Sequence, residues 1–325
     1  MDEKQAGSRA LQRGTASEIL QKLSSVLILV ALIIVMSIAN RNFFKSSNFL
    51  NILKQSSTMG VMSVGQTMVM LTGGIDLSVG NVMAVTGCLM AVVPSFGFST
   101  GISILLGLLL GIAVGFLNGI IITKGQIQPF IATLGIMLAC RGLALIITDG
   151  LSVSGMPEPM LVVGSGLFMQ VPVSIYLMIA VILIGYVILT STRYGRNIFA
   201  VGGNAEASTA SGIKVDKVKM IAYAISGFCS GLAALCLIGR LNSASGLMGS
   251  GYELNSITAV ALGGTSLAGG KGGMIGTLIG TITIGVLKNG LDLMNVTSFW
   301  QDVILGMMIV LVVLLDSWRS RKFRD

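Results

Sequence analysis

The sequence predicts an all-α polytopic membrane protein with about ten transmembrane helices, some of them broken or re-entrant. Of its 325 residues, 53% are hydrophobic and only 10% are charged, whereas soluble globular domains carry about 25% charged residues. Apolar runs with short connections recur from residue 23 to residue 316, and each span of the hydrocarbon layer needs about 20 apolar residues. The 43 glycines are typical of helices that pack closely in lipid. These features exclude a soluble enzyme and a disordered chain.

The chain begins with a polar leader, residues 1–22, which contains four Lys or Arg residues. The first apolar run, 23–39, ends in Ser37-Ile38-Ala39, which is similar to a signal-peptidase site. Because many apolar runs follow, we expect this segment to be retained as the first span rather than cleaved.

The apolar runs define one transmembrane domain, residues 23–316. Two runs, 60–71 and 252–262, have only about 11 or 12 residues, too few to cross a bilayer unaided. Each leads into a glycine-rich segment, so we expect broken or re-entrant helices that line protein or a water-filled cavity. The ten predicted spans are 23–39, 60–71, 79–93, 102–123, 130–148, 171–190, 219–239, 252–262, 273–291 and 299–316.

The basic residues orient these spans. They gather in the leader, in the loop 191–218 and in the basic tail 317–325. With ten spans, the positive-inside rule then places both termini in the cytoplasm. The net charge of +8 therefore follows membrane topology and does not indicate a nucleic-acid partner.

One segment disagrees with this topology, because 40–59 contains Arg41, Lys45 and Lys54 and would lie outside. The predicted outside loops 94–101 and 149–170 contain no Lys or Arg.

The sequence offers no catalytic or metal-binding constellation. Histidine is absent, which removes the commonest general base and metal ligand. The four cysteines lie in apolar runs without C-x-x-C spacing, so we interpret them as packing residues. The segment GGTSLAGGKGG at 263–273 is not a nucleotide-binding loop, because Gly272 follows Lys271 where Ser or Thr is required. Any nucleotide is therefore expected to be bound and hydrolysed by another chain.

Asp76 lies within an apolar region, where a carboxylate is costly and by default functional. Alternatively, it caps a helix that starts at Ser78 or Val79. Other polar side chains on apolar spans either line a hydrophilic path for a polyhydroxylated solute or tie helices together. The candidates for the translocation path are Gln66, Asp76, Asn81, Asn118 and Asn255. Arg141 and Asn289 are similarly placed.

Glycines recur at every fourth position of the span 102–123, at 107, 111, 115 and 119. This spacing puts a flat stripe on one helix face, which we expect to pack against another helix of the same chain.

The loop 191–218 contains a second local pattern. Asn204 is a candidate N-cap, an alanine-rich turn follows, and Gly212 ends it, so a short helix is predicted outside the membrane. Such a helix is either a docking surface for a cytoplasmic partner or an ordinary connection.

Four segments give the chain a family resemblance: TGGIDLSVG at 72–80, AVGGNAEASTASGI at 200–213, GYELNSITAVALGGTSLAGGKGG at 251–273 and GTLIGTITIGVLKNGLDLMNV at 276–296. With them, the chain resembles a membrane subunit of the ribose-type ABC importers, in the branched-chain amino-acid and ribose permease family. The resemblance covers about residues 25–316, and TGGIDLSVG favours the sugar branch.

This resemblance implies a type II ABC-importer-like permease in a bacterial inner membrane, forming the path for a ribose-like monosaccharide. It also implies a homodimer, or a heterodimer with a similar permease, on two cytoplasmic subunits that bind the ATP. An extracytoplasmic sugar-binding protein would deliver the solute, and the chain would hold no cofactor of its own. The implied ATPase-coupling helix comprises Asn204, Ala205, Glu206, Ala207, Ser208, Gly212 and Ile213.

One rival function is an ion-coupled secondary transporter that works alone, with Asp76 as its coupling carboxylate. Replacing Asp76 with Asn should abolish ion coupling in such a protein. An intramembrane enzyme is disfavoured, because no nucleophile with a nearby base and no paired carboxylates occur on one helix.

Overall fold

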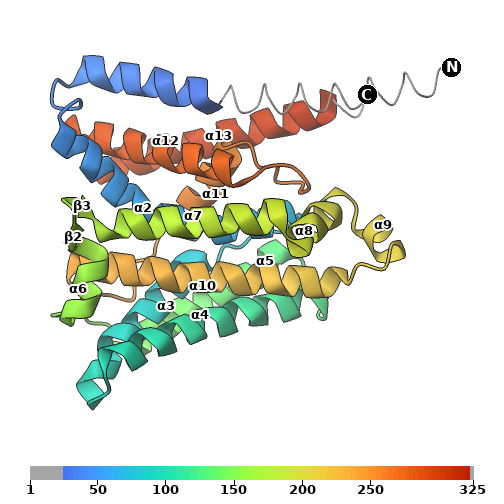
Figure 1. The fold of residues 1–325 in the computed structure, drawn as a ribbon, viewed down its shortest axis with the longest axis horizontal. Coiled ribbons are helices and arrows are strands. Elements are labelled where there is room, and N and C mark those ends of the chain that lie inside the picture. Colours follow the sequence, from blue (N-terminus) through green and yellow to red (C-terminus); the bar gives the residue numbers. More distant parts are fainter. Residues whose placement is uncertain (1–24, 323–325) are drawn as a thin grey trace.

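The computed structural model describes residues 25–322 and is predominantly helical (Figure 1). The helices before the short strands are Ser25–Ala39, α2 (Ser46–Leu71), α3 (Val79–Val92), the 3-10 helix η1 (Val93–Phe96), α4 (Thr100–Thr123) and α5 (Pro129–Ile147). The later helices are α6 (Glu158–Ser165), α7 (Val173–Ser191), α8 (Arg193–Gly203), α9 (Ala205–Ala210), α10 (Val215–Leu241), α11 (Tyr252–Leu262), α12 (Met274–Leu293) and α13 (Ser298–Lys322).

Four two-residue strands pair at one end of the bundle. They are β1 (Val153–Ser154), β2 (Leu167–Phe168), β3 (Val171–Pro172) and β4 (Ser243–Ala244). Strand β1 is antiparallel to β4, and β2 forms a hairpin with β3. The β1–β4 pair fastens the connection before α6 to the chain that leaves α10.

The helical fold class is confirmed, but the count of about ten transmembrane helices is not. Each predicted span falls on a helix, yet six helices in the described part are long and apolar enough to cross a membrane. They are Val79–Phe96, Thr100–Thr123, Pro129–Ile147, Val173–Ser191, Val215–Leu241 and Met274–Leu293. Two more apolar helices, Ser25–Ala39 and Ser298–Leu311, are shorter.

The structure corrects the predicted short span 60–71, which is the second half of the 26-residue helix α2. The hydropathy pattern stopped at Gly60 because the preceding turns carry Lys54, Gln55 and serines. Those polar turns are nevertheless helical, since α2 packs against α7, α10, α11 and α12. The other predicted short helix is present as α11, with 11 residues, and leads into the glycine-rich loop.

Helix α10 lies at the centre of the fold and packs most extensively against α4 and α2. The glycine stripe of α4 makes much of this contact, because a Cβ at Gly111 would overlap the backbone of Gly227 and one at Gly115 that of Tyr223. The predicted packing within one chain is confirmed. Only glycine permits such close backbone approach.

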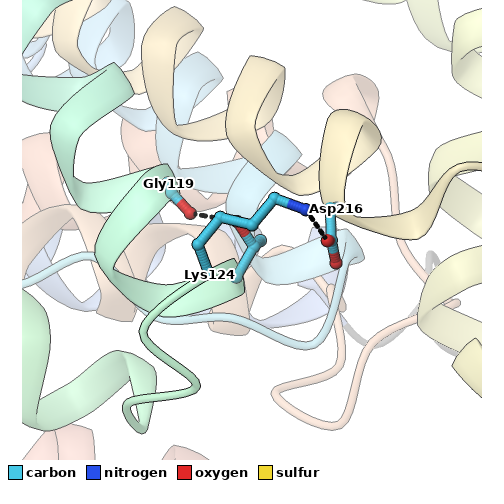
Figure 2. A network of polar contacts seen from close by, with 4 residues as sticks. Gly119, Lys124 and Asp216 are labelled. Atoms are coloured by element: carbon cyan, nitrogen blue, oxygen red, sulfur yellow. Dashed lines mark hydrogen bonds and ion pairs between the residues drawn. The ribbon is translucent and has the colours of Figure 1, made fainter.

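The bundle has two distinct ends, which Figure 1 shows on opposite sides. Helices α8 and α9 lie at one end, together with the start of α10, and α6 with the hairpin β2–β3 lies at the other. At the α9 end, Lys124 after α4 forms an exposed ion pair with Asp216 of α10, with Nζ 2.8 Å from Oδ2 (Figure 2).

The predicted leader, residues 1–22, lies outside the described residues. At the other terminus α13 runs to Lys322, past the predicted end of the last span at residue 316. Residues 323–325 of the predicted tail also lie outside the described part.

Candidate coupling helix and translocation cavity

Helix α9 projects from the bundle between α8 and α10 (Figure 1). It starts where the Asn204 side chain accepts a hydrogen bond from the Ala207 amide at 2.9 Å, which satisfies a free donor of the first turn. It ends at Ala210, and Gly212, two residues later, has a φ of +84°, which suits glycine. The amide of Ile213 then bonds back to the Ser208 carbonyl at 3.0 Å. The Asn and Gly of the predicted short helix therefore have direct structural roles.

The surface of α9 is mostly open. Glu206, Ala207 and Gly212 are exposed, whereas Ser208 is buried against the bundle. Glu206 lies in the first turn, where a carboxylate interacts favourably with the helix dipole. The exposed face offers small side chains and one negative charge to a partner.

Helix α8 is a second helix in the loop 191–218, which the sequence analysis missed. Thr192 caps it by accepting from the Gly195 amide at 3.1 Å. Ile198 and Val201, three residues apart, are buried, and this spacing is the signal that could have revealed an amphipathic helix. Tyr194 donates to the Val218 carbonyl at 3.0 Å, and burial raises its pKa. Helix α8 is thereby fixed to α10.

Backbone contacts connect α8 with the end of α2 and with the loop after α11. The Gly270 amide, in the loop after α11, donates to the Leu71 carbonyl at the end of α2 at 3.0 Å. Gly202 of α8 lies so close to the Leu71 carbonyl oxygen and the Gly270 amide nitrogen that a Cβ at this position would overlap both atoms. Helix α8 therefore packs directly against the end of α2 and the glycine-rich loop.

Asp76 is buried just before α3, with 1% of its surface exposed. Its Oδ1 accepts from the Ser78 amide at 2.9 Å and from the Ser78 hydroxyl at 2.6 Å. Its Oδ2 accepts from the Ser226 hydroxyl of α10 at 2.8 Å. The carboxylate thus joins the start of α3 to α10. The N-cap residue of α3 is Ser78, and its side chain makes no capping hydrogen bond.

Asn118 belongs to the same polar network. Its Nδ2 donates to the Ser78 hydroxyl at 2.8 Å, which brings α4 to the start of α3. The Tyr223 hydroxyl of α10 donates to the Ile75 carbonyl at 3.3 Å. The structure therefore brings Asp76 and Asn118 together through Ser78.

The other candidate path residues lie elsewhere. Asn81 is buried near the start of α3, and no hydrogen bond joins it to Asp76 or Asn118 among the described residues. Gln66 of α2 is fully buried, and neither its amide nitrogen nor its oxygen has a hydrogen-bond partner within residues 25–322. Asn255 of α11 lines a cavity, described below.

Two further polar residues have different surroundings. Asn289 of α12 exchanges two hydrogen bonds of 2.9 Å with Asn48 of α2 and so ties these helices together. Arg141 is exposed on α5.

A cavity of about 430 Å³ opens at the end of the bundle opposite α9. Its walls come from α2, α10, α11 and α12, and its volume falls within the range of small-molecule sites. Among the predicted path residues, only Asn255 lines it. The polar lining includes Asn51, Lys54, Gln55, Arg240, Asn255 and Lys288.

The sequence analysis did not select the three cations of this lining. Lys54 was visible as a conflict with the positive-inside rule, and Lys288 interrupts the predicted span 273–291. Arg240 directly follows the predicted span 219–239, at the start of a connection that the predicted topology places outside, so it too disagrees with the positive-inside rule.

Below the cavity, α2 carries a series of buried polar side chains without partners. In the part of the chain that the structure describes, the hydroxyls of Ser56 and Ser63 and the amide of Gln66 form no hydrogen bond. Ser56 lines the cavity, and the other two follow at helical spacing. Unpaired buried polar groups cost free energy, so such a series suits helices between which water or a hydroxylated solute passes.

The chain matches the family model described as branched-chain amino acid transport system / permease component over residues 48–313. It is 45% identical over 304 residues to a ribose import permease protein of Bacillus subtilis, covering 93% of this chain and 94% of that relative. The corresponding permease of Escherichia coli K12 is 42% identical, covering 92% and 94%. A D-allose transport system permease protein of Escherichia coli K12 is 34% identical, covering 88% of each chain. No solved structure matches significantly.

Proposed function

The chain belongs to the family of branched-chain amino acid transport system permease components, and from this we propose that it carries a ribose-type monosaccharide across a bacterial cell membrane. It is the membrane permease subunit of an ATP-binding-cassette importer and not an enzyme, since a separate partner hydrolyses ATP. The observation that carries the choice of solute is the identity of 45% and 42% with ribose import permeases over nearly the whole chain.

The proposed assembly contains two permease copies, two cytoplasmic ATP-binding subunits and an extracytoplasmic sugar-binding protein. Both termini of the chain lie in the cytoplasm, and ATP is bound only by the partner subunits. The exposed helix α9, with Glu206 in its first turn, supports a docking role toward an ATP-binding subunit.

In the proposed mechanism, closure of the ATP-binding subunits moves α9. The backbone contacts among Gly202, Leu71 and Gly270 transmit this movement to α2 and to the glycine-rich loop. The helices then rock, so that the path opens to one side of the membrane at a time. A sugar exchanges its hydrogen bonds with water for bonds to side chains such as Asn255 and Gln66, so the step needs no covalent chemistry.

The ion-coupled alternative rests on Asp76. Its carboxylate is buried and already accepts three hydrogen bonds from Ser78 and Ser226. This geometry favours a structural role over a titrating one.

Uptake into proteoliposomes tests the proposal. The permease, its ATP-binding partner and its binding protein are reconstituted, and uptake of labelled ribose is followed with and without internal ATP. We expect uptake that requires ATP and persists when ionophores collapse all ion gradients. Uptake that is driven by an ion gradient without ATP would refute the proposed function.

A further inference from the structure

Arg141 is a charged residue within a membrane-spanning helix. It lies in α5, one of the six helices that are long and apolar enough to cross a membrane, and its side chain is exposed. The spans Val79–Phe96, Thr100–Thr123 and Val173–Ser191 contain no charged residue. A charged side chain is costly in lipid, so at membrane depth such residues face the interior of the protein or a water-filled space. The exposed face of α5 around Arg141 is therefore unsuited to lipid.

Arg141 has no partner in the described part of the chain. Its guanidinium forms neither an ion pair nor a hydrogen bond with any residue from 25 to 322. All five of its N–H donors are thus available. Arg141 therefore does not tie α5 to another described helix.

The position of Arg141 along α5 argues against an arginine that reaches the lipid headgroups. Helix α5 begins soon after Lys124, at the α9 end of the bundle, and it ends at Ile147, six residues beyond Arg141. Six helical residues span about 9 Å. Side chains on a helix lean toward its N-terminus, which for α5 is the α9 end. The stem of Arg141 therefore leans into the membrane and away from the nearer end of α5.

The face of α5 that carries Arg141 adjoins the chain that forms and precedes α11. Met137, one turn before Arg141, packs against an apolar cluster that contains Val260 of α11. Leu145, one turn after Arg141, lies so close to Gly246 that a Cβ there would overlap it. Arg141 therefore lies between two positions at which α5 meets this part of the chain.

Helix α11 gives a second, independent reason to place water here. It has 11 residues, which span about 17 Å and are too few to cross the hydrocarbon layer. Irregular backbone at membrane depth is tolerated only where protein or a water-filled cavity surrounds it. Leu254 of α11 is 46% exposed, so the described chain does not cover that side of the helix. A water-filled space beside α5 and α11 accommodates both the short helix and the arginine.

We propose that α5 and α11 line a water-filled passage and that Arg141 donates hydrogen bonds to hydroxyl oxygens of a neutral sugar moving along it. The guanidinium offers several donors in one plane, which suits neighbouring hydroxyls of a monosaccharide. Water in the passage keeps the charge hydrated when no sugar is present. The inference rests on the proposed function and adds a specific solute contact to it.

The passage is incomplete in a single chain. The face of α5 that carries Arg141 is open, so the second permease copy of the proposed assembly closes the passage. Arg141 does not line the cavity of about 430 Å³, but α11 borders both spaces, since Asn255 lines that cavity. The contact at Arg141 is therefore separate from those proposed above for Asn255 and Gln66.

Cysteine labelling tests whether the passage contains water. The full-length Arg141→Cys permease, assembled with its ATP-binding subunits in nanodiscs, is treated with a charged thiol reagent that does not enter lipid. Such a reagent attacks thiolates, which form only in contact with water, and the four native cysteines are buried. We expect Arg141→Cys to react at least tenfold faster than Ile179→Cys. Ile179 is the control at matched depth, 46% exposed on α7 and six residues from the end opposite α9.

Leu138→Cys repeats the measurement with Arg141 in place. Leu138 is 58% exposed, one turn before Arg141, so this variant should also react at least tenfold faster than Ile179→Cys. Its result does not depend on how the loss of Arg141 affects folding. Equal rates for all three variants would overturn the passage, and this outcome is expected if α5 faces lipid and Arg141 holds a lipid phosphate.

Uptake of labelled ribose tests the contact with the sugar. Arg141→Leu removes every donor and should lower ATP-dependent uptake at least tenfold. Arg141→Lys keeps a charged donor and should retain at least a third of the uptake. Both variants should unfold at the temperature of the parent, since the guanidinium has no partner within residues 25–322. Normal uptake by Arg141→Leu would overturn the contact.

Failure of this inference is distinguishable from failure of the proposed function. Equal labelling of Arg141→Cys and Ile179→Cys, together with uptake that requires ATP, refutes only the passage. Fast labelling of Arg141→Cys, together with uptake that is driven by an ion gradient alone, refutes the importer.

Discussion

At the scale of single residues, Asp76 shows how a buried charge serves the fold. Its three hydrogen bonds come from two serines, one at the start of α3 and one in α10. Charge-assisted hydrogen bonds of this kind are stronger than neutral ones. Asp76 therefore holds the turn after α2 against the centre of the bundle.

Replacing Asp76 with Asn tests this role. The amide keeps one acceptor, and the Ser226 hydroxyl can rotate to accept from its NH₂ group, so we expect a loss of about 1 kcal/mol. Asp76→Ala removes every acceptor and should cost about 1–3 kcal/mol. Thermal unfolding in detergent measures both effects, and transport by Asp76→Asn should remain dependent on ATP. A well-folded Asp76→Asn protein that has lost transport would instead support the ion-coupled mechanism.

Sequence reasoning identified Asp76 and Asn118 separately but not the network that joins them. The link is Ser78, a common residue whose role depends on helices 40 residues apart in the chain. The cavity cations were likewise unrecognisable as a group, because Lys54, Arg240 and Lys288 come from distant segments.

At the scale of helices, the glycine stripe of α4 is the clearest agreement between pattern and packing. Every fourth position faces the neighbouring helix, so a stripe of four glycines was sufficient to predict a close contact. The partners could not be named, because periodicity shows a face and not what covers it. Gly111, Gly115 and Gly119 meet α10, whereas Gly107 meets Met90 of α3.

Gly115→Ala tests the close approach of α4 and α10. The added methyl group would overlap the Tyr223 carbonyl, so the helices must separate, at a cost of about 1–3 kcal/mol. The control is Gly135→Ala on α5, where a Cβ meets no atom within 4 Å. It should be neutral or stabilise by up to about 1 kcal/mol. Equal melting temperatures for the two variants would contradict this account.

Helix α2 marks the limit of the hydropathy pattern. Its first half carries polar side chains that face a cavity, so an analysis of apolar runs detected only the second half. Helix α9, in contrast, was predictable because its cap and its terminal glycine act within a few residues of one another.

Glu206→Lys tests the function of α9. Glu206 is exposed, and its side chain forms no ion pair with the described residues, so the variant should unfold at the same temperature as the parent. Reversed charge at the docking face should uncouple ATP hydrolysis from uptake, which we expect to fall at least tenfold. The matched control is Glu158→Lys, an exposed glutamate in the first turn of α6 at the opposite end, with uptake unchanged. Normal uptake by Glu206→Lys would remove α9 as the coupling helix.

At the scale of the whole molecule, composition alone was sufficient to predict a membrane protein, because a chain of this size with only 10% charged residues cannot cover a water-exposed surface. The number of membrane crossings was not predictable from composition. Helix α2 is long but partly polar, and α11 is apolar but has only 11 residues, so neither counts as a span by length and hydropathy. The proposed solute and partners come from relatives rather than from hydropathy.

The central claim is that α9 docks on an ATP-binding subunit, and crosslinking from position 206 tests it most directly. A photoreactive residue replaces Glu206 in the full chain, expressed together with its partners, and the crosslinked product is identified by mass spectrometry. We predict a crosslink to an ATP-hydrolysing subunit at position 206 and none from position 158. A permease that is recovered without any crosslinked ATP-binding subunit, yet still transports solute in vesicles under an ion gradient alone, would contradict the account.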